Sequence, residues 1–141
     1  SRCFDSVWPH VKDIYETLPN TDLASINRQI IQEISVQLGL SCHFKTSSEF
    51  STEGQTSDER LVALVTAVDP EGTYLSGRGG AKYQNDDKFR TAGLEIQYTD
   101  YQHPQYDQGV STFTEGLSIL DPVFHIGWSG TADLILELSG L

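Results

Sequence analysis

The sequence of 141 residues has the composition of one globular domain, with 38% hydrophobic and 21% charged residues. Its 20 acidic residues outnumber its 9 basic residues and give a net charge of -11, which disfavours binding to a nucleic-acid backbone. No apolar run approaches the roughly 18 residues of a membrane span, and no signal peptide opens the sequence. We therefore expect a cytoplasmic protein whose partners are neither nucleic acids nor membranes.

Cysteine and methionine usage adds two expectations. Cys3 and Cys42 are too few for a disulfide framework, so we expect two free thiols in a reducing compartment. The sequence contains no methionine, even at position 1. We expect a tag, a cleavage site or an upstream segment before Ser1.

The first part of the chain predicts two amphipathic helices. Apolar residues recur at helical spacing over 6–18, where Pro9 fits a helix if it lies in the first turn. A longer apolar stripe predicts a second helix over 22–38. Gly39 is placed to close that helix in a left-handed conformation.

Three short segments predict strands. Apolar and polar residues alternate over 41–46 and over 94–98, and a Pro-Glu-Gly turn leads into a short strand over 73–76. The alternation over 94–98 leaves one side polar, which is typical of a strand at the edge of a sheet. Ser41–Thr46 is therefore expected to share one sheet with the other two strands.

Helix signals lie between these strands. Thr56 and Glu59 form a capping-box pattern ahead of an apolar helix, and Asn85 is placed to cap a short helix over 86–92. The order of strands and helices, joined by short turns, predicts an α/β fold: a Rossmann-like parallel sheet flanked by helices. No linker divides the chain, so we expect a single domain over 1–141.

The last part of the chain combines an irregular segment with helical signals. Residues 100–116 are rich in Tyr, Gln and Thr and lack periodicity. Asp121 and Pro122 predict a cap and a first-turn proline for a short helix over 123–126. A final short helix is expected over 131–138.

The glycine-rich segment Ser76-Gly77-Arg78-Gly79-Gly80 is the strongest candidate for a ligand site. It follows a predicted parallel strand, where open α/β sheets bind ligands. Glycines permit a positive φ and close backbone approach, so successive N–H groups can bind an anion, with Arg78 as a second contact. The pattern matches neither the P-loop nor the dinucleotide fingerprint. The alternative is a tight turn with an exposed arginine.

Two other loops are candidates for the same end of the sheet. Ser47 and Ser48 follow the first predicted strand and can orient a sugar or amine; the alternative is ordinary hydrogen bonding within a loop. The segment 100–108 follows the third strand, and its His103 is a candidate general base. The alternative for this segment is an aromatic loop that covers the sheet edge.

Metal and thiol chemistry are not expected. The four histidines, His10, His43, His103 and His125, show no metal-ligand spacing. Neither cysteine lies in surroundings that would clearly activate a thiolate nucleophile. We expect no metal and no cofactor.

Five stretches of the chain resemble, in their order and spacing, the bacterial WbqC-like family. The family pattern has a strand ending in Tyr-Leu-Ser-Gly, a glycine pair and a tyrosine, then His-Pro-x-Tyr and Leu-Ser-Ile-x-Asp. The resemblance runs from about Phe4 to Ile126. The stretches that carry it are 23–27, 59–61, 74–83, 103–106 and 117–121.

Two departures from the family pattern accompany the resemblance. Family members begin with a His-Gln-Pro-Asn-Tyr segment that has no match here, so the chain looks like the C-terminal portion of a WbqC-like domain. The family's Phe-Asn-x-Gly reads Phe124-His125-Ile126-Gly127 in this sequence. An unpaired sheet edge is accordingly expected, covered by the upstream segment or by a second copy in a homo-oligomer.

The resemblance implies a transferase of O-antigen or surface-polysaccharide biosynthesis that moves glycine or a related acyl group onto a sugar. The implied partner is a small-molecule donor, either a nucleotide-sugar or an activated acyl group. By motif match, Ser76–Gly80 would bind the anion, His103 would be the base, Tyr83 and Tyr106 would form walls, and Asp121 would contact ligand. The alternative is a non-catalytic binding or assembly module that retains the fold, which the length of the encoded reading frame would discriminate.

Overall fold

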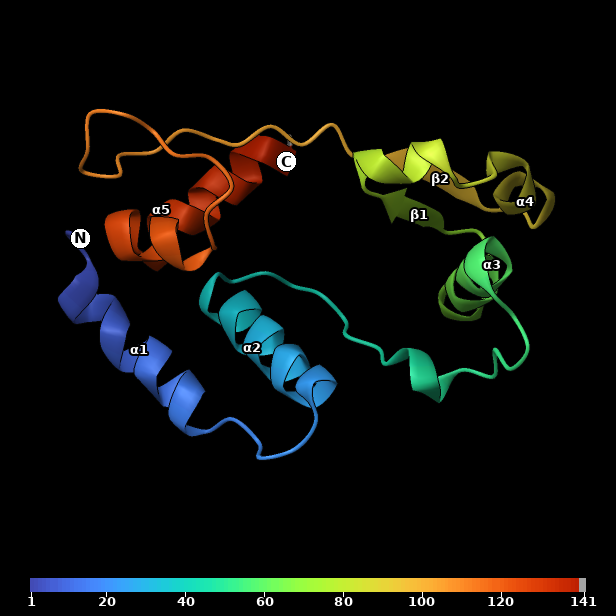
Figure 1. Cartoon of the computed structure of the whole chain (residues 1–141), viewed down its shortest axis with the longest axis horizontal. Helices are drawn as coiled ribbons and strands as arrows, with labels where there is room; N and C mark the ends of the chain where they lie inside the picture. The colour runs from blue at the N-terminus through green and yellow to red at the C-terminus, as the bar shows by residue number, and fades with distance from the viewer. Residues whose placement is uncertain (140–141) are drawn as a thin grey trace. The chain divides into compact units, whose positions relative to one another are not determined.

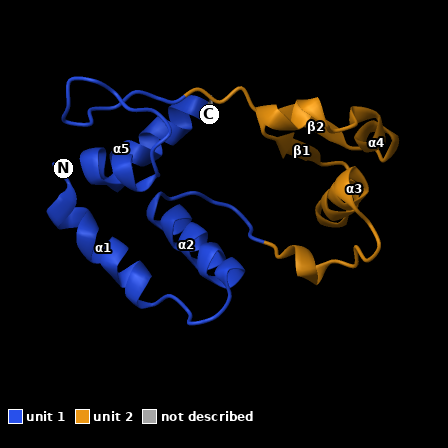
Figure 2. Ribbon diagram, in the orientation of Figure 1, with its two compact units in different colours: residues 1–44, 103–141 blue, residues 45–102 orange. Residues whose placement is uncertain are grey.

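The computed structural model describes residues 1–139 of the chain (Figure 1). These residues form two compact units, shown in Figure 2. Unit 1 contains Ser1–Phe44 and His103–Leu141, and unit 2 contains Lys45–Gln102. Unit 1 is helical, whereas the strands lie in unit 2. Each unit is therefore described by itself.

Unit 1 is built from α1 (Phe4–Glu16), α2 (Leu23–Gln37) and α5 (Leu120–Ser139). Its buried core joins Val7 and Val11 of α1, Leu38 at the end of α2, and Val123 of α5. Complete burial of such an aliphatic side chain stabilises a fold by about 1.5–3 kcal/mol. Part of each apolar stripe thus faces a common core, whereas Leu23 and Ile31 of the α2 stripe are exposed.

The start of α1 differs from the expectation. The helix begins at Phe4, two residues before the predicted Ser6, so Pro9 lies in its second turn and the first-turn prediction is wrong. The first helical bond runs from the Val7 N–H to the Cys3 carbonyl at 3.0 Å. Pro9 has no N–H to donate and leaves one backbone carbonyl of that turn without its helical partner.

Both ends of α2 agree with the sequence. Asp22 is the N-cap: its carboxylate accepts hydrogen bonds from the Ser25 hydroxyl at 2.7 Å and the Ser25 N–H at 3.0 Å. These bonds favour the charged form and lower the pKa of Asp22. Gly39 has a φ of +68°, and the Leu40 N–H then donates to the Ser35 carbonyl. Gly39 therefore closes the helix in the left-handed conformation, as predicted.

Helix α5 is kinked. Gly127, with φ 77° and ψ 174°, interrupts the helical backbone between two segments that the sequence predicted as separate helices. Cys3 lies against the kink: its N–H donates to the Phe124 carbonyl at 3.0 Å and its Sγ to the His125 carbonyl at 3.7 Å. Cys3 thus satisfies carbonyl groups beside the interruption in the helix.

Unit 2 is a mixed helix and strand unit around a small parallel sheet. Strand β1 (Thr73–Ser76) pairs with β2 (Glu95–Tyr98) in the register Thr73 to Glu95 through Ser76 to Tyr98. Helix α4 (Asp86–Thr91) lies between the strands in sequence and covers one face, where Phe89 stacks on Tyr74 at 5.3 Å. Both strands and this helix were predicted, including the Asn85 cap, whose side chain accepts from the Asp87 N–H.

The strand predicted over 41–46 is absent. Residues 41–46 have no regular structure, and the boundary between the two units falls within them. Cys42 and Phe44, whose alternation with polar neighbours suggested a strand, are both exposed. The prediction failed because alternation over so few residues does not supply a pairing partner. The sheet in the described residues therefore has the order β1-β2.

Helix α3 (Ser57–Val68) was predicted correctly, but its predicted cap was not. The Thr56 side chain makes no capping hydrogen bond, and Ser57 has a φ of 50°. Glu59 instead forms an ion pair with Lys88 of α4. The capping-box geometry occurs at the 3-10 helix η1 (Ser47–Glu49), where the Thr46 N–H donates to Glu49 Oε1 at 3.2 Å.

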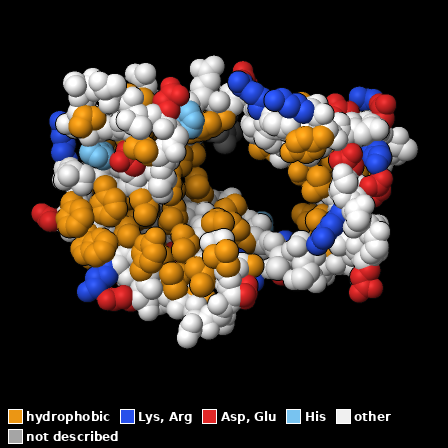
Figure 3. All heavy atoms as spheres, in the orientation of Figure 1, with side chains coloured by type: hydrophobic (Ala, Val, Ile, Leu, Met, Phe, Trp, Pro, Cys, Tyr) orange, Lys and Arg blue, Asp and Glu red, His pale blue; other side chains and the backbone are white. Residues whose placement is uncertain are grey.

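An aromatic cluster lies on the surface of unit 1. The Phe4 ring stacks on Trp8 at 5.8 Å and on Phe124 at 5.5 Å; Figure 3 shows hydrophobic side chains gathered on this unit. Phe4 is 46% exposed and Trp8 44%. None of the described helices has the length and apolar run that a bilayer crossing needs.

Candidate functional site

The predicted site residues are distributed over both units. Unit 2 carries Ser47, Ser48, Ser76–Gly80 and Tyr83. Unit 1 carries His103, Tyr106 and Asp121.

The glycine-rich segment forms a 3-10 helix rather than an open loop. Helix η2 (Arg78–Lys82) follows Gly77, and the Gly80 N–H donates to the Gly77 carbonyl at 2.8 Å. Gly77, Gly79 and Gly80 are not among the residues with positive φ, so the positive-φ argument for a glycine anion site is wrong. These glycines adopt backbone angles that other residues also tolerate.

Close packing explains one glycine of this segment. A Cβ added at Gly80 would overlap Ser76 Oγ and Gln84 Oε1, which are joined by a 2.7 Å hydrogen bond donated by the Ser76 hydroxyl. Ser76 is buried at the end of β1. A Cβ added at Gly79, by contrast, would meet no atom within 4 Å. Ser76 and Gly80 therefore have a structural part in joining β1 to η2.

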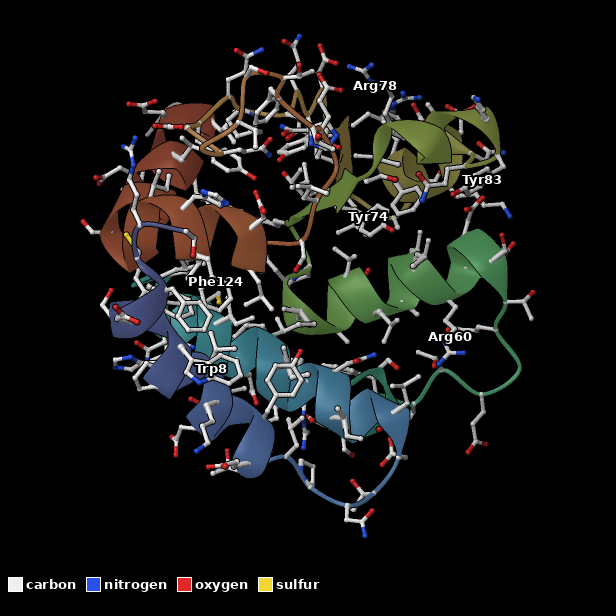
Figure 4. All side chains as sticks on the ribbon, turned by 60° about the vertical axis from the view of Figure 1, so that its left-hand side comes forward. Trp8, Arg60, Tyr74, Arg78, Tyr83 and Phe124 are labelled. Carbon is white, nitrogen blue, oxygen red and sulfur yellow. The ribbon has the colours of Figure 1, made fainter. Side chains whose placement is uncertain are left out.

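Arg78 is held at the surface by a carboxylate. It forms an ion pair with Asp100, which follows β2, and both side chains are largely exposed. Figure 4 shows Arg78 pointing away from the body of unit 2. Tyr83, at the end of η2, is 76% exposed. An anion approaching Arg78 would therefore compete with Asp100 for the guanidinium group.

Ser47 and Ser48 lie on η1 and are exposed. Ser47 lines a groove of about 370 Å³ with Val65 of α3 and with Gly72 and Thr73 at the beginning of β1. Ser76–Gly80 lie at the other end of this strand. The structure therefore does not bring Ser47 to the glycine-rich segment, because the strand that was expected to place it there is absent.

A second groove in unit 2, of about 450 Å³, lies between α3 and α4. Its lining includes Val62 and Thr91 together with the Glu59 and Lys88 ion pair. The hydrogen bond between these two side chains lowers the pKa of Glu59 and raises that of Lys88. No local pattern predicts this pair, since 29 residues separate its members.

Tyr106 and Asp121 are brought together in unit 1. The Tyr106 hydroxyl donates to Asp121 Oδ2 at 2.5 Å, and the buried Gln108 donates from Nε2 to the same oxygen at 3.3 Å. Gln108 is itself held by Thr114: its Nε2 donates to the Thr114 carbonyl at 2.9 Å and its Oε1 accepts from the Thr114 N–H at 2.8 Å. This polar cluster fixes the orientation of the Asp121 carboxylate.

His125 faces the other oxygen of this carboxylate. Its Nε2 lies 3.9 Å from Asp121 Oδ1, and the two side chains are 21% and 27% exposed. Both residues are on α5 with i,i+4 spacing, one turn apart. Asp121 was predicted as a helix cap, but α5 begins at Leu120, so Asp121 lies within the first turn.

His103 lies in the same unit, in the irregular segment before Tyr106. Its side chain is exposed, and a Cβ added at Gly116 would lie 4.0 Å from its ring. Gln108 and His125 were not selected from the sequence. The spacing of Asp121 and His125 was the available signal, but Asp121 was expected to be the cap of a helix over 123–126 rather than a residue within it.

The described residues contain no group of three or more His, Cys, Asp or Glu side chains arranged to hold a metal ion. Around Asp121, unit 1 offers a fixed carboxylate, the phenol of Tyr106 and the imidazole of His125, and the imidazole of His103 lies in the same unit. Such groups accept protons and orient hydroxyl or amino groups.

Comparison with known proteins found one family model and one curated relative that match most of the chain. The chain is 28% identical over 116 residues to the uncharacterized protein Rv1507c of Mycobacterium tuberculosis, an alignment that covers 81% of this chain and 49% of the relative. The chain thus spans about half the length of this curated relative. No solved structure matches it. A family model described as the WbqC-like protein family matches residues 1–133, and this chain belongs to that family.

Proposed function

We propose that the chain is part of a bacterial transferase that moves glycine or a related acyl group onto a sugar during O-antigen or other surface-polysaccharide synthesis. Family membership and the polar cluster of unit 1 support this function. The reaction would take place in the cytoplasm, where thiols such as those of Cys3 and Cys42 stay reduced.

The proposed reaction needs few groups from the protein. A sugar hydroxyl or amine attacks the carbonyl carbon of an activated acyl donor, a new C–O or C–N bond forms, and the bond to the leaving group breaks. The proton of the attacking group passes to a base on the protein. A fixed set of hydrogen-bond partners must also hold the nucleophile close to the carbonyl carbon.

The observation that carries the proposal is the geometry around Asp121. Its carboxylate is fixed on one side by Tyr106 and Gln108 and is 27% exposed on a face that also presents His125. A partly exposed carboxylate beside an imidazole is the arrangement that orients and deprotonates a nucleophile. His103 and His125 are the two histidines of this unit that can serve as the base.

Arg78 is the proposed contact for an anionic ligand on unit 2. Its guanidinium group already binds one carboxylate, that of Asp100, and guanidinium groups bind phosphates and carboxylates in the same bidentate manner. Tyr83 lies next to η2 and is exposed, so it can form an aromatic wall for the same ligand.

We also propose that β1 and β2 belong to a larger Rossmann-like sheet. Each of these strands has a hydrogen-bonded neighbour on one side within the described residues, and Leu75 of β1 is 64% exposed. Parallel strands are ordinarily covered on both faces and paired in larger sheets. An upstream segment or a second copy would supply the missing strand.

A thermal-shift screen with nucleotide-sugars and activated glycyl donors tests ligand binding. A ligand at about 100 times its Kd adds about 2.7 kcal/mol to the free energy of unfolding, so a binding donor raises the melting temperature measurably. A donor panel that leaves the melting temperature unchanged at millimolar concentration would contradict the proposed function.

A further inference from the structure

We propose that Asp121 and His125 form the acceptor site of the transferase: Asp121 Oδ1 and His125 Nε2 hold the amine of an amino sugar between them, and His125 takes its proton. This inference rests on the proposed transfer reaction and names a base that the sequence did not select. It makes His125, rather than His103, the catalytic base.

The distance between the two atoms supports this assignment. Asp121 Oδ1 and His125 Nε2 are 3.9 Å apart, too far for a direct hydrogen bond. An amino nitrogen placed about 2.8 Å from each would donate one N–H to each of the two acceptors, at an angle of roughly 90°. A single amino group therefore fits the space that the pair leaves, whereas a hydroxyl has one proton and can donate to only one of them.

The orientation of Asp121 leaves one oxygen for this task. Tyr106 and Gln108 both donate to Oδ2, at 2.5 and 3.3 Å. Gln108 cannot easily turn, because Thr114 holds both ends of its amide. Oδ1 is therefore directed toward His125, and Gln108 is a positioning residue for the carboxylate.

The position of His125 is also constrained. Its residue lies two positions before the kink at Gly127, where its carbonyl accepts from Cys3 Sγ at 3.7 Å. On another side the ring lies beside Gly109, where an added Cβ would be 3.9 Å from Nδ1. Gly109 has a φ of +71°, a backbone conformation that is unfavourable for residues with a Cβ. With 21% of its side chain exposed, the imidazole is accessible but restricted in movement.

The chemical step follows from this geometry. The amino nitrogen of the acceptor forms its bond to the acyl carbon as the bond to the leaving group breaks, and one of its protons passes to His125 Nε2. The Asp121 carboxylate then faces an imidazolium, whose positive charge it stabilises. An amine acceptor gains further, because its protonated form is attracted to the same carboxylate before it reacts.

Binding of two simple probes tests this site without requiring turnover. Methyl glucosaminide carries an amine and methyl glucoside a hydroxyl at the same position, so the two arms distinguish the nucleophile. Binding is measured by NMR titration of the protein with each probe. The variants are Asp121→Asn and His125→Asn, with His10→Asn as the matched control, because His10 is exposed on α1 beside the Ser6 carbonyl.

We expect both site variants to weaken binding of the preferred probe at least tenfold, with the His10→Asn variant unchanged. His125→Asn leaves the hydrogen bonds of Tyr106 and Gln108 to Asp121 in place, so it reports on the site even if Asp121→Asn destabilises the fold. Wild-type affinity in the His125→Asn variant, or no binding of either probe to the wild type, would overturn the inference.

Transfer assays separate this inference from the proposed function. If the wild type binds the probe but no donor yields product, the acceptor site stands and the transfer reaction is wrong. If the wild type transfers and the His125→Asn variant transfers equally well while the His103→Asn variant does not, His103 is the base and this inference is wrong.

Discussion

The phenol of Tyr106 donates to the carboxylate of Asp121 across 2.5 Å, which ties the irregular segment of unit 1 to the first turn of α5. The two residues are 15 positions apart, so the bond is a tertiary contact rather than a local turn. It also occupies Asp121 Oδ2, so this oxygen is less available to accept a hydrogen bond from a ligand. The chemistry proposed for unit 1 depends on this constraint, because it leaves the other oxygen facing His125.

Removing the Gln108 amide should destabilise unit 1. Gln108→Ala removes a buried side chain and its hydrogen bonds to Thr114 and Asp121, and each lost hydrogen bond costs about 0.5–1.5 kcal/mol. We expect the free energy of unfolding in urea to fall by about 2–3 kcal/mol. The exposed Gln105 is the control: Gln105→Ala should stay within about 0.5 kcal/mol of wild type. Equal stability of the two variants would contradict the described cluster.

Adding a methyl group at Gly80 should destabilise unit 2, because the new Cβ would overlap Ser76 Oγ and Gln84 Oε1. We expect Gly80→Ala to cost about 1–3 kcal/mol in urea unfolding. Gly79→Ala meets no atom within 4 Å and should be neutral or stabilise by up to about 1 kcal/mol. A Gly80→Ala protein as stable as the Gly79→Ala protein would show that Gly80 does not pack against Ser76 and Gln84 as described.

Local signals predicted most helices and the two strands of the sheet. The Asp22 and Asn85 caps and the left-handed Gly39 depend on neighbouring residues, so the sequence contains what determines them. The strand expected over 41–46 depended instead on a pairing partner elsewhere in the chain. The form of η2 was missed because glycines permit many conformations and do not select one.

The stability of unit 2 should depend on Tyr98 at high pH. The Tyr98 hydroxyl donates to Asp86 at 2.6 Å, and this bond to the carboxylate raises the pKa of Tyr98 to about 12. Tyrosine in the unfolded chain titrates near 10, so the stabilising effect is present below about pH 10 and is lost as the pH rises toward 12. The stability advantage of wild type over Tyr98→Phe should shrink over this range.

Urea unfolding of both proteins at several pH values between 9 and 12 measures this advantage, and the absorbance of the phenolate reports the titration directly. A difference between wild type and Tyr98→Phe that does not change with pH would contradict the role of the Asp86 hydrogen bond.

Binding of an anionic donor should depend on Arg78. We expect Arg78→Ala to weaken binding of a nucleotide-sugar found in the thermal-shift screen about tenfold, which is the loss of one charge-assisted contact. Asp100→Asn should strengthen the same binding, because it removes the carboxylate that competes for Arg78. Lys12, paired with Glu16 on α1, is the control, and Lys12→Ala should bind like wild type. Calorimetric affinities that are equal for the Arg78 and Lys12 variants would support a simple turn with an exposed arginine.

The candidate site was less predictable than the fold. Tyr106 and Asp121 were identified because their motifs resemble the family, but nothing local links Gln108 to Thr114 or places His125 beside Asp121. These contacts arise when the irregular segment packs against α5. Ser47 was expected near Ser76–Gly80 through a strand that does not form, so a local error became an error in the site.

Acyl transfer is tested most directly by mass spectrometry of methyl glucosaminide and methyl glucoside after incubation with the purified protein and a glycyl thioester or glycyl adenylate. We predict an acceptor that gains the mass of one glycyl group, at a rate reduced at least a hundredfold in His125→Asn, a loss typical of a missing general base. The His10→Asn variant should react at the wild-type rate. The transferase function would be contradicted if both acceptors keep their mass with every donor and the thermal-shift screen also shows that the protein binds none of these donors.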